Sequence, residues 1–408
     1  MLILNMQNVL TLMPATGPAS GRATVIFLVQ PPQTSNRCGT PGDQELKKTL
    51  FKSEAVKLFV AVCAAVALSG CGGGGSSGSA PQASDPSTPA PTPAPAPTPA
   101  PAPGVNTTPQ LASYAAGSPE AAAFTTLNAE RGSCGFGFLK QSAKLDTATG
   151  DANVYFAARA AESIASAQAF SHLEAGGKSA FTGAFPWDRA EFRGYGAPAD
   201  VAEDNSTVSF SVANAQSNLT ISNGLVTSLL TSVYHLSSLM APRTELGLAF
   251  IRTTSADKWD TSRLNMTIGI PAGDARQVST AVRTYPCQGT TQVGATFVPS
   301  NESPNPAPDL GAAVIGTPIY VNGPEGQTMD LTSATVTATA GGAVVPSRLL
   351  TRANEPVFAS TGVHGLGLNE AFVLPTAALT KGASYTVTVA GNSNGTAFTK
   401  TFAFVPSL

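Results

Sequence analysis

The sequence predicts an α+β protein with two folded domains, a first domain of helices followed by strands and a second that is all β. Apolar residues recur at helical intervals within 118–240, and two runs of strict alternation follow at 246–250 and 264–270. The last quarter of the chain shows alternation alone. Helices that precede strands within one domain are typical of an α+β or three-layer arrangement. We therefore expect the first domain over 111–288 and the second over 305–408.

Three helices are expected in the first domain. The first begins at Ser118-Pro119-Glu120, because serine is a good N-cap, proline suits the first helical position and an acid suits the first turn. The second is expected over 151–169. The third is expected over 224–240, where apolar residues follow one another at intervals of three and four.

The second domain reads as a β-sandwich. Its strands are expected around three alternating runs, 334–338, 385–389 and 402–404. A turn at 392–395 separates the last two strands. Tyr385 lies six residues after Leu379 at the start of a strand, which resembles the tyrosine corner of an immunoglobulin-like β-sandwich. The Pro- and Asn-rich stretch 299–308 is expected to separate the two domains.

Composition excludes two classes of protein. Charged residues make up 12% of the chain, against roughly 25% in ordinary soluble domains. The 23 basic and 25 acidic residues leave a net charge of −2, which argues against binding nucleic acid through its phosphates. No apolar run reaches the roughly 18–20 residues of a membrane-spanning helix, which argues against a polytopic membrane protein.

A lipoprotein signal peptide is expected at 46–70. Its apolar run, 58–68, follows four lysines: Lys47, Lys48, Lys52 and Lys57. The run ends in Leu68-Ser69-Gly70-Cys71, which resembles a bacterial lipobox, so we expect cleavage before Cys71 and a lipid on its thiol. Gly72 stands where an aspartate would retain a lipoprotein in the inner membrane. We therefore expect secretion across the inner membrane and lipid anchoring at the cell envelope, in the outer membrane.

The segments on either side of the signal peptide have no expected fold. Residues 1–45 lack periodicity and lie upstream of a complete signal, so we expect them to be a spurious extension, with translation starting near Leu46 or Leu50. The segment 71–110 is rich in Gly and Pro, with ten prolines within 81–103. Such a composition prefers an extended polyproline II stalk.

The five cysteines divide by position. Cys38 and Cys63 precede the cleavage site, and Cys71 would carry lipid. Cys134 and Cys287 remain, near the two ends of the first domain. In an oxidising compartment they are expected to form a disulfide, and two free buried thiols are the alternative.

The mature chain contains three histidines. His172 follows the second expected helix, and His364 is expected to be an exposed loop residue of the second domain. His235 lies 100° around the third helix from the core residue Leu236, so it is expected to border a polar stripe.

An ordered set of short motifs accompanies these histidines. The motifs are Leu127-Asn128-Ala129-Glu130-Arg131, Phe170-Ser171-His172, Asp188-Arg189 with Gly194-Tyr195, Ala202-Glu203-Asp204-Asn205, Ser232-Val233-Tyr234-His235, and Thr244-Glu245-Leu246-Gly247. In this order and spacing, the set resembles the CAP superfamily, which includes cysteine-rich secretory proteins, antigen five and pathogenesis-related proteins. The resemblance covers about 120–288.

The resemblance implies a three-layer α-β-α CAP-like sandwich with a central cleft. Its cleft residues would be His172, Glu203, His235 and Glu245, and Asp188, Arg189 and Tyr195 would hold a loop over the cleft. Two departures stand out. The family's arginine after the second histidine is Leu236 here, and one residue is inserted in the family's Gly-Glu-Asn motif around Glu203.

Three kinds of chemistry remain open for these residues. Two imidazoles and one or two carboxylates could hold a divalent cation such as Zn²⁺, or bind a small ligand or lipid of the envelope or a host. His172 and Glu203 could instead act as acid and base in a metal-dependent or protease- or esterase-like hydrolase. The third possibility is hydrogen bonding within a vestigial cleft of a structural or adhesive envelope protein. We expect a surface-anchored binding module that is not an enzyme.

Overall fold

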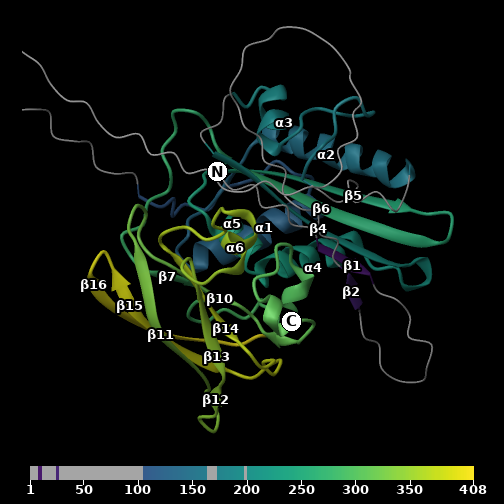
Figure 1. Ribbon diagram of the computed structural model, residues 1–408. Coiled ribbons are helices and arrows are strands. Elements are labelled where there is room, and N and C mark those ends of the chain that lie inside the picture. Colours follow the sequence, from purple (N-terminus) through teal and green to yellow (C-terminus); the bar gives the residue numbers. More distant parts are fainter. Residues whose placement is uncertain (1–7, 12–23, 27–103, 163–171, 197–199) are drawn as a thin grey trace, which may run out of the picture. The chain divides into compact units, whose positions relative to one another are not determined.

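The computed structural model describes residues 8–11, 24–26, 104–162, 172–196 and 200–408 (Figure 1). The protein is a mixed α/β protein with several largely antiparallel sheets, none of which closes into a barrel. The expected signal peptide, its lipidated cysteine and most of the expected stalk lie outside the described residues. We call residues 104–282 the helical lobe and residues 283–408 the sandwich lobe.

The helical lobe is built on a sheet that β1 and β2, from outside 104–282, extend to six strands with the order β2-β1-β4-β6-β5-β3. The strands are β1 (Asn8–Thr11), β2 (Thr24–Ile26), β3 (Lys140–Gln141), β4 (Asp200–Ser211), β5 (Glu245–Thr254) and β6 (Trp259–Ile270). The long strands β4, β6 and β5 pair antiparallel with β6 in the middle. On one side of these three strands β1 pairs parallel with β4, and on the other side β3 pairs parallel with β5. The two alternating runs expected at 246–250 and 264–270 are confirmed as β5 and β6.

Helices cover both faces of this sheet (Figure 1). They are α1 (Pro119–Ser133), α2 (Ala143–Glu162), α3 (Pro186–Phe192), α4 (Asn218–Leu230) and α5 (Tyr234–Met240). The helices α2 and α3 lie on one face, where α2 contacts β5 and β6 and α3 contacts β4. The helices α1, α4 and α5 contact the same sheet from the other side.

The two faces of the sheet differ in chemistry because successive side chains of a strand point to opposite faces. One face carries the apolar residues Leu246, Leu248, Leu264, Met266 and Ile268. The face toward α2 is polar: Thr149 of α2 hydrogen bonds Thr267 of β6 at 2.8 Å, and Asn153 of α2 donates to the carbonyl of Ala249. Buried polar side chains are therefore concentrated on the α2 side of the sheet.

The sandwich lobe contains two four-stranded antiparallel sheets, with the orders β13-β14-β10-β7 and β12-β11-β15-β16. Its strands are β7 (Arg283–Tyr285), β8 (Thr296–Phe297), β9 (Ile315–Gly316), β10 (Ile319–Asn322), β11 (Met329–Ala338), β12 (Val344–Val345), β13 (Ser347–Thr351), β14 (Glu370–Pro375), β15 (Tyr385–Ser393) and β16 (Thr396–Phe404). Contacts of β11 with β13 and β14 join the two sheets in a sandwich-like pair. A short helix, α6 (Pro356–Thr361), precedes β14.

In the sandwich lobe, a turn and three strands were predicted from short stretches of sequence, and the structure contains them. The turn between β15 and β16 places Asn394 and Gly395 at positive φ, as a tight hairpin with Asn-Gly requires. The Tyr385 hydroxyl accepts a hydrogen bond from the backbone N–H of Thr380 at 2.7 Å, the backward contact that defines a tyrosine corner. The strands expected around 334–338, 385–389 and 402–404 are confirmed.

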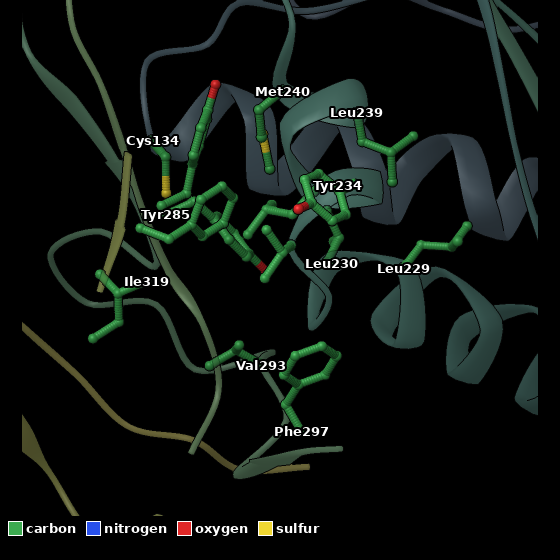
Figure 2. Close-up of a cluster of buried hydrophobic side chains, with 14 of the residues drawn as sticks. Cys134, Leu229, Leu230, Tyr234, Leu239, Met240, Tyr285, Val293, Phe297 and Ile319 are labelled. Atoms are coloured by element: carbon green, nitrogen blue, oxygen red, sulfur yellow. The ribbon is translucent and has the colours of Figure 1, made fainter. Parts of the chain in front are cut away.

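One hydrophobic core runs through both lobes. Figure 2 shows side chains of α4 and α5 beside residues of the sandwich lobe, among them Tyr234, Tyr285, Phe297 and Ile319. Cys134 and Cys287 lie at disulfide distance with their Cα atoms 5.5 Å apart, so the expected pairing is confirmed. The strand β7 pairs with β10, so residues 283–285 join the sandwich lobe before the expected domain boundary at 288.

The single helix expected over 224–240 is wrong, because the chain breaks between α4 and α5. Glu302 causes the second helix to begin anew: its carboxylate accepts the backbone N–H groups of Val233 at 2.8 Å and Tyr234 at 2.7 Å. These N–H groups would be used inside one continuous helix. Glu302 belongs to the stretch expected to be a separating linker, yet it is 1% exposed.

Two other helix expectations have mixed outcomes. The start at Ser118 is confirmed, since its hydroxyl accepts the N–H of Ala121 as an N-cap. The helix expected over 151–169 begins earlier, at Ala143, and its expected last residues lie outside the described ones. Ala and Thr in its first two turns hid the early start, because they carry little apolar periodicity.

Candidate functional site

A cavity of about 290 Å³ lies where the two lobes meet. The helical lobe contributes His172, Trp187, Asp200, Glu203, Asp204, Ser238, Arg243 and Arg276 to its walls, among others. The sandwich lobe contributes Glu325, Gly365, Asn369 and Glu370, among others. The walls therefore combine polar and apolar side chains, and they hold more carboxylates than cationic groups.

His172, Glu203 and Arg189 form a buried charged group at one wall. The Nδ1 atom of His172 is 2.9 Å from Oε1 of Glu203, and Arg189 Nη2 donates to the other carboxylate oxygen at 2.7 Å. All three side chains are 1% exposed. Glu203 comes from β4, and Arg189 comes from α3, which packs on that strand. Arg189 also donates to the carbonyl of His172, so it fixes the histidine as well as the carboxylate.

The charges around Glu203 decide its protonation state. Burial by itself would raise the pKa of Glu203, but the guanidinium of Arg189, the hydrogen bond and charge of His172 and the charge of Arg263 outweigh burial. Together they lower the pKa of Glu203 to about 2. Glu203 is therefore ionised at ordinary pH, where it can orient His172 but cannot supply a proton.

Asp188 and Arg189 make further contacts around this group. Asp188 accepts the backbone N–H of Phe185 at 3.1 Å and so fixes the start of α3. Arg189 reaches Glu174 at 3.6 Å in addition to Glu203. Burial raises the pKa of Glu174, against the opposing charge of Arg189. Tyr195 packs against Gly269 of β6, where a larger residue would collide with its ring.

Asp204 is a site residue that the sequence analysis missed. It follows Glu203 on β4 and therefore points to the opposite face, toward α5. Ser238 of α5 donates its hydroxyl to Asp204 Oδ2 at 2.8 Å. Burial raises the pKa of Asp204 despite the lowering effects of His235, the Ser238 hydrogen bond, His172 and Arg243. The sequence does contain a sign of this role, because the residue inserted in the motif around Glu203 places a second acid beside it.

The other two expected cleft residues do not line the cavity. His235 was expected to border a polar stripe, but it is 0% exposed. The break before α5 turns it inward, where its Nδ1 lies 3.5 Å from Glu302. Glu245 begins β5 and pairs with Lys140 at 3.4 Å. Of the four expected residues, only His172 and Glu203 meet at the cavity.

His364 is also less exposed than expected. Its side chain is 22% exposed, its Nδ1 is 2.8 Å from the buried Glu355, and its ring stacks on Phe358. Glu355 also accepts the backbone N–H groups of Gly365 and Leu366. Glu355 thus fixes the loop that contributes Gly365 to the cavity wall.

The residues present do not fit a metal centre. Within the described part of the chain, no group of three or more His, Cys, Asp or Glu side chains is arranged to hold a metal ion. Both oxygens of Glu203 are already engaged, one of them by the cation of Arg189. A divalent cation beside Arg189 would be repelled by it.

One contact across the lobe boundary joins the cavity walls, and contacts within the sandwich lobe brace its side of the wall. Glu370 of β14 accepts the hydroxyl of Ser237 from α5 at 2.9 Å, and it also accepts the backbone N–H of Gly367. Glu325 accepts from Asn369 and lies 3.7 Å from Arg283 of β7. The cavity is therefore a feature of the joined lobes, and either lobe alone would have only part of its wall.

Fold and site together define a two-lobed α/β protein with a cavity between its lobes that is lined in part by charged side chains. No protein-family model matches the chain, and no curated protein matches it significantly. None of the described helices is both long enough and apolar enough to cross a membrane.

Proposed function

We propose that the protein is a binding protein of the cell envelope that holds a small polar ligand in the cavity between its lobes. The observation that carries this proposal is a cavity of about 290 Å³ whose walls bring charged side chains from both lobes together, with Glu203 and Asp204 of the helical lobe buried. Small-ligand sites are concave and use a few placed polar groups for recognition. Charged side chains are expensive to bury, so their concentration around one cavity favours a function there.

Among the ligand classes expected from the sequence, a small polar molecule has the best support. Carboxylates and arginines are prominent among the residues that line the cavity. Against a lipid tail these charged groups would lose their hydration and form no hydrogen bond or ion pair in return. A Zn²⁺ ion is disfavoured by the arginine that engages Glu203. A hydrolase that uses Glu203 as its acid is disfavoured by the low pKa of that carboxyl.

The location of the protein is part of the same proposal. A signal peptide at 46–70, a lipid on Cys71 and a Pro-rich stalk would tether the lobes to the envelope, with the outer membrane as the site of anchoring. The disulfide between Cys134 and Cys287 supports an oxidising compartment.

The proposed family is the CAP superfamily, with an immunoglobulin-like domain after it. Helices on both faces of one sheet and the pairing of His172 with Glu203 support the first part. The two facing sheets and the Tyr385 corner support the second. The alternative of a purely adhesive sandwich lobe has less support, because loops of this lobe complete the cavity wall.

Ligand-dependent stabilisation tests the proposal. The mature chain would be screened by thermal unfolding against amines, amino acids, sugars and small organic acids, since a ligand that binds only the folded state raises the midpoint. Ala241 lines the cavity, so Ala241→Trp should fill it and abolish the shift, and Ala241→Ser is the matched control. A shift that is equal in both variants, or no shift with any compound, would overturn the proposal.

A further inference from the structure

We infer that the ligand of this cavity is an organic cation, a small ammonium or guanidinium compound, bound through its charged group to Asp204. The inference rests on the proposed function and adds the chemical class of the ligand. It is carried by three observations on the cavity walls: an open carboxylate oxygen, an excess of acidic groups and an aromatic ring.

Asp204 is a buried carboxylate with one oxygen available to a ligand. It lines the cavity and is 2% exposed. Its Oδ2 accepts the hydroxyl of Ser238, and no donor among the described residues reaches its Oδ1. A buried carboxylate normally has hydrogen bonds to both oxygens or an ionic partner, so Asp204 has unused capacity to bind a donor.

The other carboxylates of the wall are already occupied. Asp200 is paired with both cavity arginines, Arg243 at 3.1 Å and Arg276 at 3.0 Å. Glu203 has Arg189 and His172 as partners. Of these three acids, Asp204 is the one that has no ion pair among the described residues.

The charge on the sandwich side has the same sign. Glu325 and Glu370 also line the cavity: Glu325 lies 3.7 Å from Arg283, and Glu370 accepts hydrogen bonds from Ser237 and Gly367 but has no ion pair among the described residues. Burial raises the pKa of Glu325, against the lowering charge of Arg283, as burial also raises the pKa of Asp204. A cation bound between the lobes would stabilise the ionised form of both carboxyls.

The size and the aromatic lining favour an organic cation over a metal ion. A cavity of about 290 Å³ is far larger than a dehydrated ion, and the described residues offer no three-ligand group for one. Trp187 lines the same cavity, and Phe185 stacks on it with ring centroids 4.7 Å apart, which orients the indole. An indole face attracts ammonium and guanidinium groups.

Titration calorimetry on the mature full-length chain tests this inference. The probes are agmatine and choline as cations, butane-1,4-diol as a neutral compound and glutarate as an anion. We expect at least one cation to bind and Asp204→Asn to weaken it at least tenfold, with Asp330→Asn, an exposed acid outside the cavity, as the matched control. Trp187→Leu, which leaves β4 untouched, should weaken the same probe about three- to tenfold.

Proton linkage provides a second readout. Binding a cation to Asp204 should release protons, and affinity should rise as pH rises through the raised pKa of this carboxyl. Binding of the diol or glutarate with no binding of either cation would overturn the inference and leave the proposed function standing. Cation binding that is unchanged in both Asp204→Asn and Trp187→Leu would also overturn it. The proposed function itself would fall only if no compound raised the unfolding midpoint, or if Ala241→Trp and Ala241→Ser gave the same shift.

Discussion

Glu302 and His235 are joined at the start of α5: Glu302 Oε1 accepts the backbone N–H of His235 at 3.3 Å and lies 3.5 Å from the Nδ1 atom of its ring. Glu302 comes from the Pro- and Asn-rich stretch 299–308 of the sandwich lobe, and His235 comes from the helix that carries Ser237 and Ser238 to the cavity. One buried carboxylate thus caps this helix and faces its histidine. The stretch 299–308 is therefore a structural part of the site.

Replacing Glu302 should destabilise the protein strongly. Glu302→Ala leaves the N–H groups of Val233 and Tyr234 buried without their acceptor, so we expect a loss of about 3 kcal/mol in the free energy of unfolding. Glu302→Gln keeps one acceptor oxygen but loses the negative charge at the helix start, and should cost about 1–2 kcal/mol. Urea unfolding measures both, with the exposed Glu191→Ala as control. Equal midpoints for Glu302→Ala and Glu191→Ala would contradict the capping role.

Glu203 should make the protein sensitive to acid. Its folded-state pKa of about 2 lies below the ordinary value of 4.5, so its contribution is present above pH 4.5 and is lost as pH falls toward 2. At pH 7 this difference corresponds to about 3 kcal/mol. Glu203→Gln should lose this stability at pH 7, because the buried Arg189 loses the nearer of its two carboxylate partners and keeps only Glu174 at 3.6 Å.

The pH dependence separates this effect from a general loss of packing. The gap in urea midpoint between wild type and Glu203→Gln should be largest at pH 7 and should shrink on titration to pH 3. A gap that stays constant over this range would show that Glu203 contributes through packing alone.

Asp204 should behave in the opposite way to its neighbour. Its folded-state pKa is raised, so its contribution is present below the ordinary pKa of an aspartate and is lost as pH rises through the folded value. Asp204→Asn removes that charge and should leave the ligand-free protein at least as stable as wild type at pH 7. Thermal unfolding without ligand checks this, and a large fall in the midpoint would show that Asp204 stabilises the fold as an anion.

The sequence predicted elements whose signals are local. The N-cap Ser118, the Asn394-Gly395 turn and the alternating strands each depend on a few neighbouring residues, and all were found as expected. Cysteine counting found the disulfide because only two cysteines remained. Glu203 and His172 were reached through a resemblance, since nothing in their spacing shows that they meet.

The missed features depend on contacts between distant residues. Glu302 lies in a Pro-rich stretch that reads as a spacer, and its partners Val233 and Tyr234 are nearly seventy residues away, at separations of 69 and 68. Apolar intervals continue through the break that it causes, so periodicity alone predicted one helix. Asp204 was missed because neighbouring strand residues point to opposite faces, and only the position of α5 shows that its face also reaches the cavity.

The disulfide should stabilise the joined lobes. Cys134 ends α1 and Cys287 follows β7, and the bond closes a loop with a sequence separation of 153 residues. A crosslink of this span restricts the unfolded chain, so the double variant Cys134→Ser/Cys287→Ser should lose about 2–5 kcal/mol. Denaturant unfolding of the variant, compared with wild type with and without reductant, measures the loss. A reductant that leaves the wild-type midpoint unchanged would contradict the predicted crosslink.

The helical lobe should not fold without the sandwich lobe. A chain of 104–298 would lack Glu302 at the start of α5, the partner strand of β7 and the side chains that complete the shared core. We expect it to be insoluble, or soluble without a cooperative thermal transition, because buried apolar surface of α4 and α5 would face water. The matched control is 104–408, which like 104–298 lacks the stalk and the strands β1 and β2, but keeps both lobes and should unfold cooperatively. A soluble 104–298 with a sharp transition of its own would show that the lobes are independent domains, and the cavity between them would then form by docking of two stable units.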